Sequence, residues 1–568
     1  MSRPIFTACS TWALHDELGD SVPLDEALVL RALDSLERWR GFDFFPQYFN
    51  IDYGWTDPEL GFRRFHRQRW PDGPNRILNR IREMGMLPGL WYPVNGGRLR
   101  VPGWQTSLSS DHWNYSLLDG PFYDDLSDGI LYAAETWGVR FFKFDFADFA
   151  AALPSDLRPF ETRYALGVER FVEMVARLKR SAPDVITIAH CGFARQDSGG
   201  RLGPGVPPLA ADPALLEVID GFFSGDPQPT DLPATAIHRS ADLYQDIQVR
   251  AMLENGFPLQ RIEDHGAMCG LTNTCHRRGR EGLRRSHIAQ LARGGRRDLF
   301  YGDPSLPSDD DLAGMASARR LFMDAWNRSL ETTPIGSKPG EGPWHGWLTG
   351  GGRRGLAWLV NPHLQACLIR LPITNLARAE VLFYEGARPA LQTQPDEMIL
   401  RLGPEQAALI GLGAYAAPEW VLPPDESTRL PRGAELLSLT WQPTPNGLTA
   451  TLPSVLPAHS ELIVIASIRD GAPHLPGPFA ALRIGHEDDR NGVITEPMPH
   501  HLVSITVEGQ SCVGQVPSVS LWNGTSWVLR RFAPPPAGAV INIQSKLDPP
   551  LRIRAQAWWV EWQTENIA

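Results

Sequence analysis

The first ~330 residues alternate short apolar runs with amphipathic segments, which is typical of βα units joined into a parallel sheet. The expected strands lie at 5–8, 44–51, 86–92, 139–146, 185–190, 216–223, 261–265 and 298–301. The expected helices lie at about 24–39, 74–84, 124–137, 161–180, 245–255, 282–293 and 309–327. About eight βα units in a segment of this length predict a (β/α)8 TIM barrel, an α/β fold.

From about residue 340 the pattern changes to short strands that Gly and Pro interrupt, at 347–349, 355–360 and 367–371. This pattern predicts a β-sandwich that ends near residue 415. The stretch 423–427 has the composition of a linker, and from about 433 the alternation typical of strands returns. We therefore expect three domains: a barrel over 1–330, a β-sandwich over 335–420 and a further β-sandwich-like domain of unknown role over 430–568.

Composition excludes several classes of protein. The net charge of −11 and the lack of a basic stripe argue against a nucleic-acid partner. No apolar run approaches the ~20 residues of a membrane span, and the N-terminus has no signal-peptide pattern. Six cysteines without a CxxC pair favour reduced thiols and a cytoplasmic location. Cys269, Cys275, His265 and His276 fit no zinc spacing, so no metal or other cofactor is expected.

One expected strand, 139–146, carries Lys143 and Asp145 two positions apart, and hence on one face. Burying both groups is costly unless they face a polar pocket. In a βα barrel the carboxyl ends of the strands form the active site. Asp145 is therefore the candidate centre, and the plainer alternative is a structural carboxylate paired with Lys143.

Other expected strand ends carry acidic, aromatic or cysteine residues, in the stretches 50–55, 89–93, 190–192 and 238–244. Each has a structural alternative as well. Asp52 precedes a Gly-containing turn that it could cap, and Trp55 and Trp91 could be core residues. Cys191 could be a small buried residue. The chain has 19 Trp, and because indole faces suit the C–H faces of sugars, carbohydrate contact is one interpretation of this content.

Together these stretches resemble the motifs of the retaining α-galactosidase clan, glycoside hydrolase families 27 and 36, with the raffinose synthases as relatives. The stretch 51–55 stands in the place of the motif Asp-Asp-Gly-Trp, and Gly-x-x-x-Gly-Leu-Trp is matched by 85–91. The nucleophile motif Lys-x-Asp is matched by 143–145, and the cysteine motif is echoed by 190–192. The acid/base motif, Arg shortly before Ala-Asp or Asp-Asp, is similar to 239–242. The motifs follow the family's order and the similarity covers about residues 4–330.

The resemblance implies retaining hydrolysis of a terminal α-glycoside by double displacement, with α-galactoside as the leading substrate. In this scheme Asp145 attacks the anomeric carbon, and Asp242 protonates the leaving oxygen and later activates water. The resemblance further implies that the small-molecule carbohydrate is bound by Asp52, Trp55, Trp91, Lys143, Cys191 and Arg239.

Several positions depart from the family. Tyr53 stands where the second carboxylate is expected, and Ala147 stands where the family has Asn. The long separation between Asp145 and Asp242 leaves Asp226 as an alternative acid/base. A raffinose-synthase-like transglycosylase and a barrel that binds sugar without chemistry therefore stay open. The sequence determines neither the sugar nor the oligomeric state, and a homo-oligomer is compatible with it.

Overall fold

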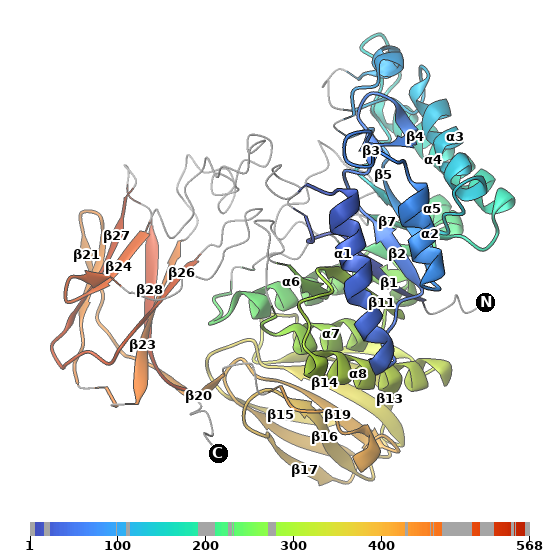
Figure 1. The fold of residues 1–568 in the computed structure, drawn as a ribbon. Helices are drawn as coiled ribbons and strands as arrows, with labels where there is room; N and C mark the ends of the chain where they lie inside the picture. The colour runs from blue at the N-terminus through green and yellow to red at the C-terminus, as the bar shows by residue number, and fades with distance from the viewer. Residues whose placement is uncertain are drawn as a thin grey trace. The chain divides into compact units, whose positions relative to one another are not determined.

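The computed structural model of the 568-residue chain describes residues 6–15, 23–97, 99–109, 114–190, 211–224, 230, 232–270, 280–425, 430–454, 456–457, 459–468, 503–511, 527–546, 550 and 552–562. The chain divides into two compact units, whose helices and strands carry their labels in Figure 1. The first unit comprises Met1–Asp226, Gln248–Thr272 and Gly295–Ala316. The second unit comprises Pro227–Ile247, Asn273–Gly294 and Ser317–Ala568. The boundaries of the three expected domains stay a prediction.

Nine parallel strand segments of the first unit form one sheet, in the order β10-β11-β1-β2-β5-β6-β7-β8-β9. They are β1 (Phe6–Ser10), β2 (Tyr48–Ile51), β5 (Leu87–Pro93), β6 (Phe141–Asp145), β7 (Ile186–His190), β8 (Gly221–Phe223), β9 (Ile262–Glu263), β10 (Ala267–Cys269) and β11 (Arg297–Gly302). Only residues 264–266 separate β9 from β10, the two segments at the ends of this order. They are therefore halves of one interrupted seventh strand that closes the ring, and the predicted TIM barrel is confirmed.

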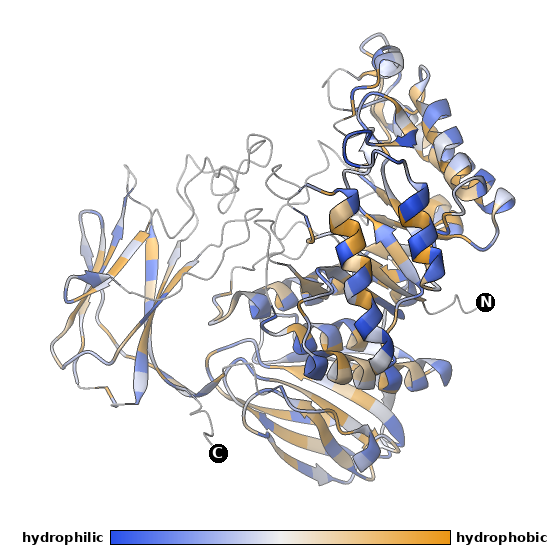
Figure 2. Ribbon diagram, in the orientation of Figure 1, coloured by the Kyte–Doolittle hydropathy of each residue, from blue (hydrophilic) through white to orange (hydrophobic). Residues whose placement is uncertain are grey.

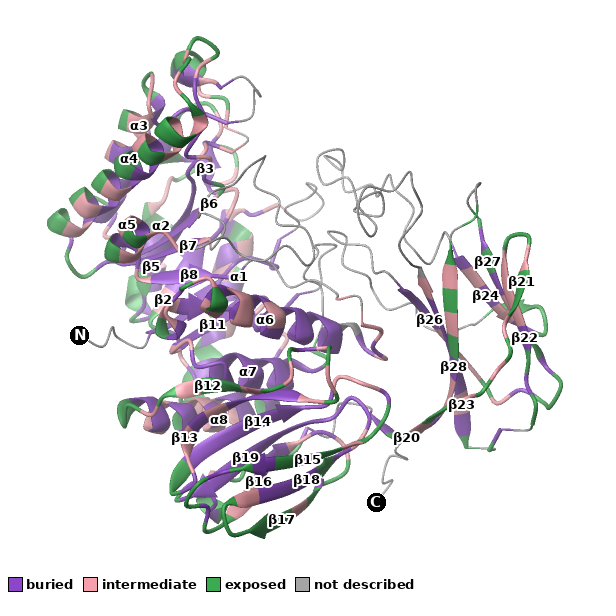
Figure 3. Cartoon of the chain, turned by 180° about the vertical axis from the view of Figure 1, so that it is seen from behind, coloured by how far each residue is buried: buried purple, intermediate pink, exposed green. Residues whose placement is uncertain are grey.

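Helices alternate with these strands along the chain, as expected. They are α1 (Glu26–Leu36), α2 (Asn75–Glu83), α3 (Phe122–Glu135), α4 (Phe160–Ser181), α5 (Pro213–Val218), α6 (Ile237–Glu254), α7 (Leu283–Ala292) and α8 (Asp309–Asn327). The Asp25 side chain caps α1 by accepting a hydrogen bond from the Leu28 N–H. Along α1 and α2 hydrophobic and hydrophilic positions alternate (Figure 2), whereas α3 and α4 carry much of the exposed surface of the first unit (Figure 3). Among the described residues, no helix is long and apolar enough to cross a membrane.

Two sequence predictions about the middle of the chain are wrong. The expected strand 216–223 is helix α5 followed by the short strand β8, because a brief apolar run does not distinguish a helix from a strand. The stretch 238–244, expected to follow a strand end, lies inside α6, which begins at Ile237 rather than near 245. Arg239 and Asp242 are therefore helical residues.

The barrel interior is filled by side chains from alternate positions of the strands. This cluster contains Phe6, Ala8, Phe141, Ile186, Ile188, Phe223, Met268, Leu299 and Tyr301. Because side chains alternate faces along a strand, residues two positions further on also point inward. This alternation places Ser10, Lys143, Asp145 and His190 on the inward face at the carboxyl ends of their strands.

The second unit contains two β-sandwiches, which confirms the predicted pair of all-β domains. In the first, the sheet β12-β13-β14-β19-β16 faces the sheet β15-β18-β17 across a shared apolar core. Its strands are β12 (Thr332–Gly336), β13 (His345–Gly351), β14 (Arg354–Val360), β15 (Cys367–Pro372), β16 (Ala379–Tyr384), β17 (Ala390–Gln394), β18 (Glu397–Leu402) and β19 (Ala407–Gly413). In the Gly-rich stretch 350–355, β13 and β14 form a hairpin whose turn is Gly352-Arg353, and Gly350, near the end of β13, has a φ of 77°.

The other sandwich pairs the sheet β20-β28-β23-β26 with the sheet β21-β22-β27-β24-β25. Its strands are β20 (Pro431–Leu436), β21 (Gln442–Thr444), β22 (Gly447–Thr451), β23 (Ser460–Ile468), β24 (Val503–Val507), β25 (Gln510–Ser511), β26 (Trp527–Phe532), β27 (Val540–Ser545) and β28 (Ile553–Trp562). Apart from these, the first unit has a small hairpin of β3 (Thr56–Asp57) and β4 (Gly61–Phe65).

Candidate active site

A buried ion pair lies at the carboxyl ends of β2 and β6. The Lys143 Nζ atom donates to the Asp52 Oδ2 atom at 3.0 Å, and both side chains are almost completely buried. The same oxygen accepts hydrogen bonds from Ser10 Oγ and Asn50 Nδ2, each at 3.0 Å. The Tyr53 N–H donates to Asp52 Oδ1 at 2.9 Å. These donors take the place of water around the buried Asp52 carboxyl group. A turn-capping role alone would not require so many donors.

The Lys143 ammonium is also surrounded by aromatic rings. It lies 5.5 Å from the ring centroid of Trp12, 5.0 Å from that of Phe223 and 5.3 Å from that of Tyr301. Such cation–π contacts stabilise a charge in a site that excludes water. Lys143 therefore forms part of the floor of the barrel mouth, two positions before Asp145 on the same face of β6.

The Asp145 carboxylate is the partly exposed acid at this mouth. Its Oδ2 atom accepts a hydrogen bond from Trp91 Nε1 at 3.2 Å, and its Oδ1 atom accepts one from the Phe146 N–H at 2.9 Å. Phe146 has a φ of 50°, a left-handed conformation that is uncommon for a bulky residue. The two donors hold this carboxyl group in a fixed orientation, as a nucleophile requires.

Trp91 and Trp55 have different surroundings. The Trp91 ring packs edge-on against Tyr53 and Phe146, with centroid separations of 5.3 and 5.8 Å. Trp55 is fully buried, and its indole N–H donates to the backbone oxygen of Trp91 at 2.7 Å. Trp91 thus contacts the candidate nucleophile directly, whereas the burial of Trp55 favours its alternative role as a core residue that supports Trp91.

His190, at the end of β7, lies in the field of both charged residues of β6. Burial lowers the pKa of His190, the Asp145 charge raises it and the Lys143 charge lowers it, with a net decrease. The imidazole is therefore neutral near pH 7. Cys191, the next residue, lies outside the described residues.

Glu263 is a further acid that the sequence patterns did not single out. It ends β9 with 1% of its surface exposed, and Tyr301 Oη donates to its Oε2 atom at 3.0 Å. Burial, followed by the charge of Asp264, raises the pKa of Glu263 well above its usual range. The sequence offered one sign of this residue, an acid at an inward position of the expected strand 261–265. This sign is weak, because the register of a short strand is hard to predict from sequence.

The remaining two predicted site residues belong to the second unit and contact its other parts. Both carboxylate oxygens of Asp242 accept hydrogen bonds from Ser286 Oγ, at 2.8 and 3.1 Å, and Oδ2 lies 3.3 Å from Arg285 Nε. Arg239 donates to Glu405 Oε2 at 2.7 Å. All of these charged side chains are nearly fully buried. These contacts join α6 to α7 and to the turn before β19.

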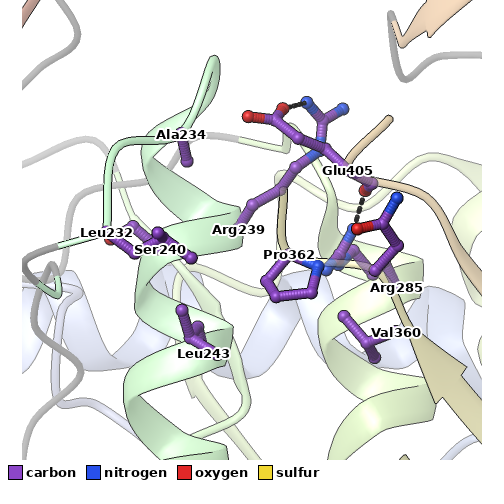
Figure 4. A pocket seen from close by; sticks show the side chains of 10 residues that line it. Leu232, Ala234, Arg239, Ser240, Leu243, Arg285, Val360, Pro362 and Glu405 are labelled. Atoms are coloured by element: carbon purple, nitrogen blue, oxygen red, sulfur yellow. Dashed lines mark hydrogen bonds and ion pairs between the residues drawn. The ribbon is translucent and has the colours of Figure 1, made fainter. Parts of the chain in front are cut away.

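Arg239, Arg285 and Glu405 line a small cavity of the second unit (Figure 4). Its other lining residues are Leu232, Ala234, Ser240, Leu243, Val360, Asn361 and Pro362. Arg285 also donates to the Glu405 backbone oxygen at 3.2 Å and to Glu385 Oε2 at 2.6 Å. Among the described residues that line this cavity, the charged side chains Arg239, Arg285 and Glu405 each lie beside an opposite charge.

The structure therefore brings together Asp52, Trp91, Lys143 and Asp145 in the first unit, and Arg239 and Asp242 in the second. Asp226, the alternative acid/base, lies outside the described residues. Among the described residues there is no group of three or more His, Cys, Asp or Glu side chains that could hold a metal ion. The barrel mouth thus contains an oriented carboxyl group, Asp145, and a buried ammonium group, Lys143.

Comparison with known proteins supports the fold. No family model and no curated protein matches the chain. Among solved structures, an α-galactosidase from Lactobacillus brevis matches with 14% identity and a TM-score of 0.50, over 72% of this chain and 55% of that one. A putative α-galactosidase from Bacteroides fragilis NCTC 9343 matches with 16% identity and a TM-score of 0.44, over 72% and 78% of the two chains.

A GH36 α-galactosidase from Geobacillus stearothermophilus matches with 14% identity and a TM-score of 0.48, over 72% of this chain and 56% of that one. The chain thus spans little more than half of the L. brevis and G. stearothermophilus enzymes. The resemblance to the α-galactosidase clan seen in the sequence is confirmed at the level of the fold: a barrel followed by β-domains.

Proposed function

We propose that this protein is a retaining glycoside hydrolase that cleaves a terminal α-glycoside, with Asp145 as the nucleophile. The observation that carries the proposal is the Asp145 carboxylate, partly exposed at the carboxyl end of a barrel strand and held by two hydrogen-bond donors. Barrel enzymes place their catalytic groups at this end of the strands. The match of the barrel to the fold of α-galactosidases makes an α-galactoside the leading substrate.

In the first step a carboxylate oxygen of Asp145 forms a bond to the anomeric carbon while the bond from that carbon to the leaving oxygen breaks. A second acid gives its proton to the leaving oxygen. It then takes a proton from the water that cleaves the glycosyl–enzyme ester, which releases the sugar with retained configuration. The Lys143–Asp52 pair supplies a charged donor and a charged acceptor. Because the two side chains are 3% and 0% exposed, a sugar hydroxyl group that binds them must enter this buried pair.

The test is hydrolysis of a panel of aryl α- and β-glycosides by the wild-type protein and by Asp145→Asn. The substitution should lower kcat/KM by about 10³-fold or more without changing the circular dichroism spectrum, because it removes the nucleophile and keeps the shape. Asp148→Asn is the matched control: Asp148 lies three residues further on and accepts a hydrogen bond from Asn114 at 3.0 Å. An Asp145→Asn variant as active as the control would contradict the proposal.

The second acid is either Asp242, which the family motif indicates, or Asp226. Both oxygens of Asp242 have partners in Ser286 and Arg285, which a catalytic role would have to exchange. Alanine variants at the two positions separate them. The variant that lacks the true acid/base should recover turnover with azide and should retain most activity on a dinitrophenyl glycoside, whose leaving group needs no proton.

The same assays test the other functions that the sequence left open. A transglycosylase would transfer the sugar to an acceptor hydroxyl at high acceptor concentration, which product analysis detects. A barrel that only binds sugar would cleave none of the aryl glycosides, although a sugar would still raise its thermal stability.

A further inference from the structure

Glu263 faces the same interior space as Lys143. It pairs in register with Phe223 on the neighbouring parallel strand, so the two side chains point to one side of the sheet. The Phe223 ring lies 5.0 Å from the Lys143 ammonium. The Tyr301 ring lies 5.3 Å from the same ammonium, and its hydroxyl group bonds to Glu263. Lys143 thus has two acids near it, Asp52 from β2 and Glu263 from β9.

The two acids differ in the number of hydrogen bonds that they accept. The Oδ2 atom of Asp52 accepts three hydrogen bonds, one of them from Lys143. Glu263 receives one hydrogen bond, from Tyr301 to Oε2, and its Oε1 atom has no hydrogen-bond partner among the residues that the structure describes. A buried carboxylate with so few donors is much more costly than a buried carboxylic acid.

The charged and titratable groups around Glu263 also favour its neutral form. The charges of Lys143 on β6 and Arg297 on β11 act on it, and Tyr301 on β11 donates a hydrogen bond to it. Asp264 adjoins it in sequence, and the His265 Nε2 atom lies 3.9 Å from its Oε2 atom. Burial and the Asp264 charge outweigh the opposing effects of Lys143, Tyr301 and Arg297, so the pKa of Glu263 is raised.

We propose that Glu263 is a positioning residue that acts through Lys143: it stays a neutral carboxylic acid during turnover and so leaves the Lys143 ammonium paired with Asp52, next to Asp145. An ionised Glu263 would compete with Asp52 for the one ammonium group and would draw it away from the sugar site. This role rests on the proposed glycosidase function. It predicts that activity depends on the protonated form of Glu263 and declines as that proton is lost at high pH.

The test is the pH profile of kcat/KM on a dinitrophenyl α-glycoside, because the acid/base residue does not shape the profile for such a leaving group. Glu263→Gln mimics the neutral acid and cannot ionise. It should keep kcat/KM within about threefold of wild type near pH 7 and remain active at least about one pH unit further into the alkaline range. Tyr301→Phe keeps the ring beside Lys143 but removes a donor to the carboxylate, so it should also shift the alkaline decline upward.

A tenfold or larger loss in Glu263→Gln near pH 7 would overturn the proposal, since the ionised form would then be needed. An alkaline decline that neither variant moves would overturn it as well and would leave Glu263 with a packing role only.

An infrared measurement without substrate separates this proposal from the proposed function. Near pH 7 the wild-type spectrum should contain the C=O band of a protonated carboxyl that Glu263→Gln lacks. Because burial also raises the pKa of Glu385, a Glu385→Gln spectrum identifies the band of that residue. If the wild-type protein cleaves no glycoside, the proposed function is wrong. If Glu263→Gln loses a carboxylate band and no band of a protonated carboxyl, Glu263 is ionised in the wild-type protein and the positioning role is wrong.

Discussion

Replacing Asp242 with Asn separates a structural role for this residue from the catalytic role that the family motif implies. The substitution keeps the shape of the side chain and removes its charge. In the wild-type protein Asp242 and Arg285 are each about 3% exposed, with 3.3 Å between Oδ2 and Nε. The Asn side chain retains one oxygen, which can still accept the hydrogen bond from Ser286. Arg285 keeps Glu385 and the Glu405 backbone oxygen as partners.

The size of the effect follows from these remaining contacts. Removing one partner of a buried ion pair typically costs about 3–5 kcal/mol, because the other charge stays buried without its counter-charge. Glu385 compensates Arg285 only in part, since burial raises the pKa of Glu385 and favours its neutral form. With Ser286 and the backbone oxygen retained, we expect a loss of about 2–3 kcal/mol in the free energy of unfolding of the second unit. For a folding unit of this size, the melting temperature should fall by about 3–5 °C.

The assay is thermal unfolding followed by circular dichroism, together with kcat/KM on an aryl glycoside measured well below the transition. Glu397→Gln is the control, because Glu397 forms a more exposed ion pair with Arg370 in the same unit. That pair should contribute less than about 1 kcal/mol. A structural Asp242 gives a lowered melting temperature and near-normal turnover. An unchanged melting temperature together with lost activity that azide restores would refute the reasoning and make Asp242 the acid/base.

Three further substitutions test other parts of the structure. Burial alone would raise the pKa of Asp246, but the Arg293 guanidinium holds this pKa well below its usual range. The stability of the wild-type protein should therefore fall as pH drops below about 4. In acid unfolding curves, Asp246→Asn should lack the share of this pH dependence that Asp246 contributes. Trp91→Phe removes one donor to Asp145 and should lower kcat/KM by about 10–100-fold, measured well below the melting temperature, which the smaller buried ring should also lower. Glu461→Gln disrupts the paired hydrogen bonds from Arg531 and should destabilise the C-terminal sandwich by about 1–2 kcal/mol in urea unfolding.

The sequence predicted strands correctly where an apolar run was bounded by clear helical periodicity. The expected strands 86–92, 139–146 and 185–190 correspond to β5, β6 and β7, because their apolar runs are bounded by clear helical segments. The inward face shared by Lys143 and Asp145 followed from their spacing alone. The partner of Lys143 did not, since Asp52 lies on another strand and pairing across a sheet leaves no local signal.

The stretch around Asp242 shows where sequence patterns are ambiguous. Arg239 and Asp242 are three residues apart, which fits a strand-end motif and also fits neighbouring positions on one helix face. The structure has the helical arrangement, with both side chains directed at partners in α7 and the first sandwich. Glu263 was missed for a related reason: its importance depends on its burial and on Tyr301, neither of which a two-residue strand segment reveals.

The barrel's stretch of sequence and the first sandwich cannot be exchanged independently, because ion pairs connect residues of the two. Helices α6 and α7 come from the barrel's stretch of sequence, yet their arginines find counter-charges in residues beyond 380. Arg239 binds Glu405, Arg285 binds Glu385 and Arg284 lies 3.3 Å from Asp425. A version of the chain cut after α8 would leave three guanidinium groups without these carboxylates, at a cost of several kcal/mol for each. Exchanging the first sandwich for that of another protein would thus require redesign of both helices.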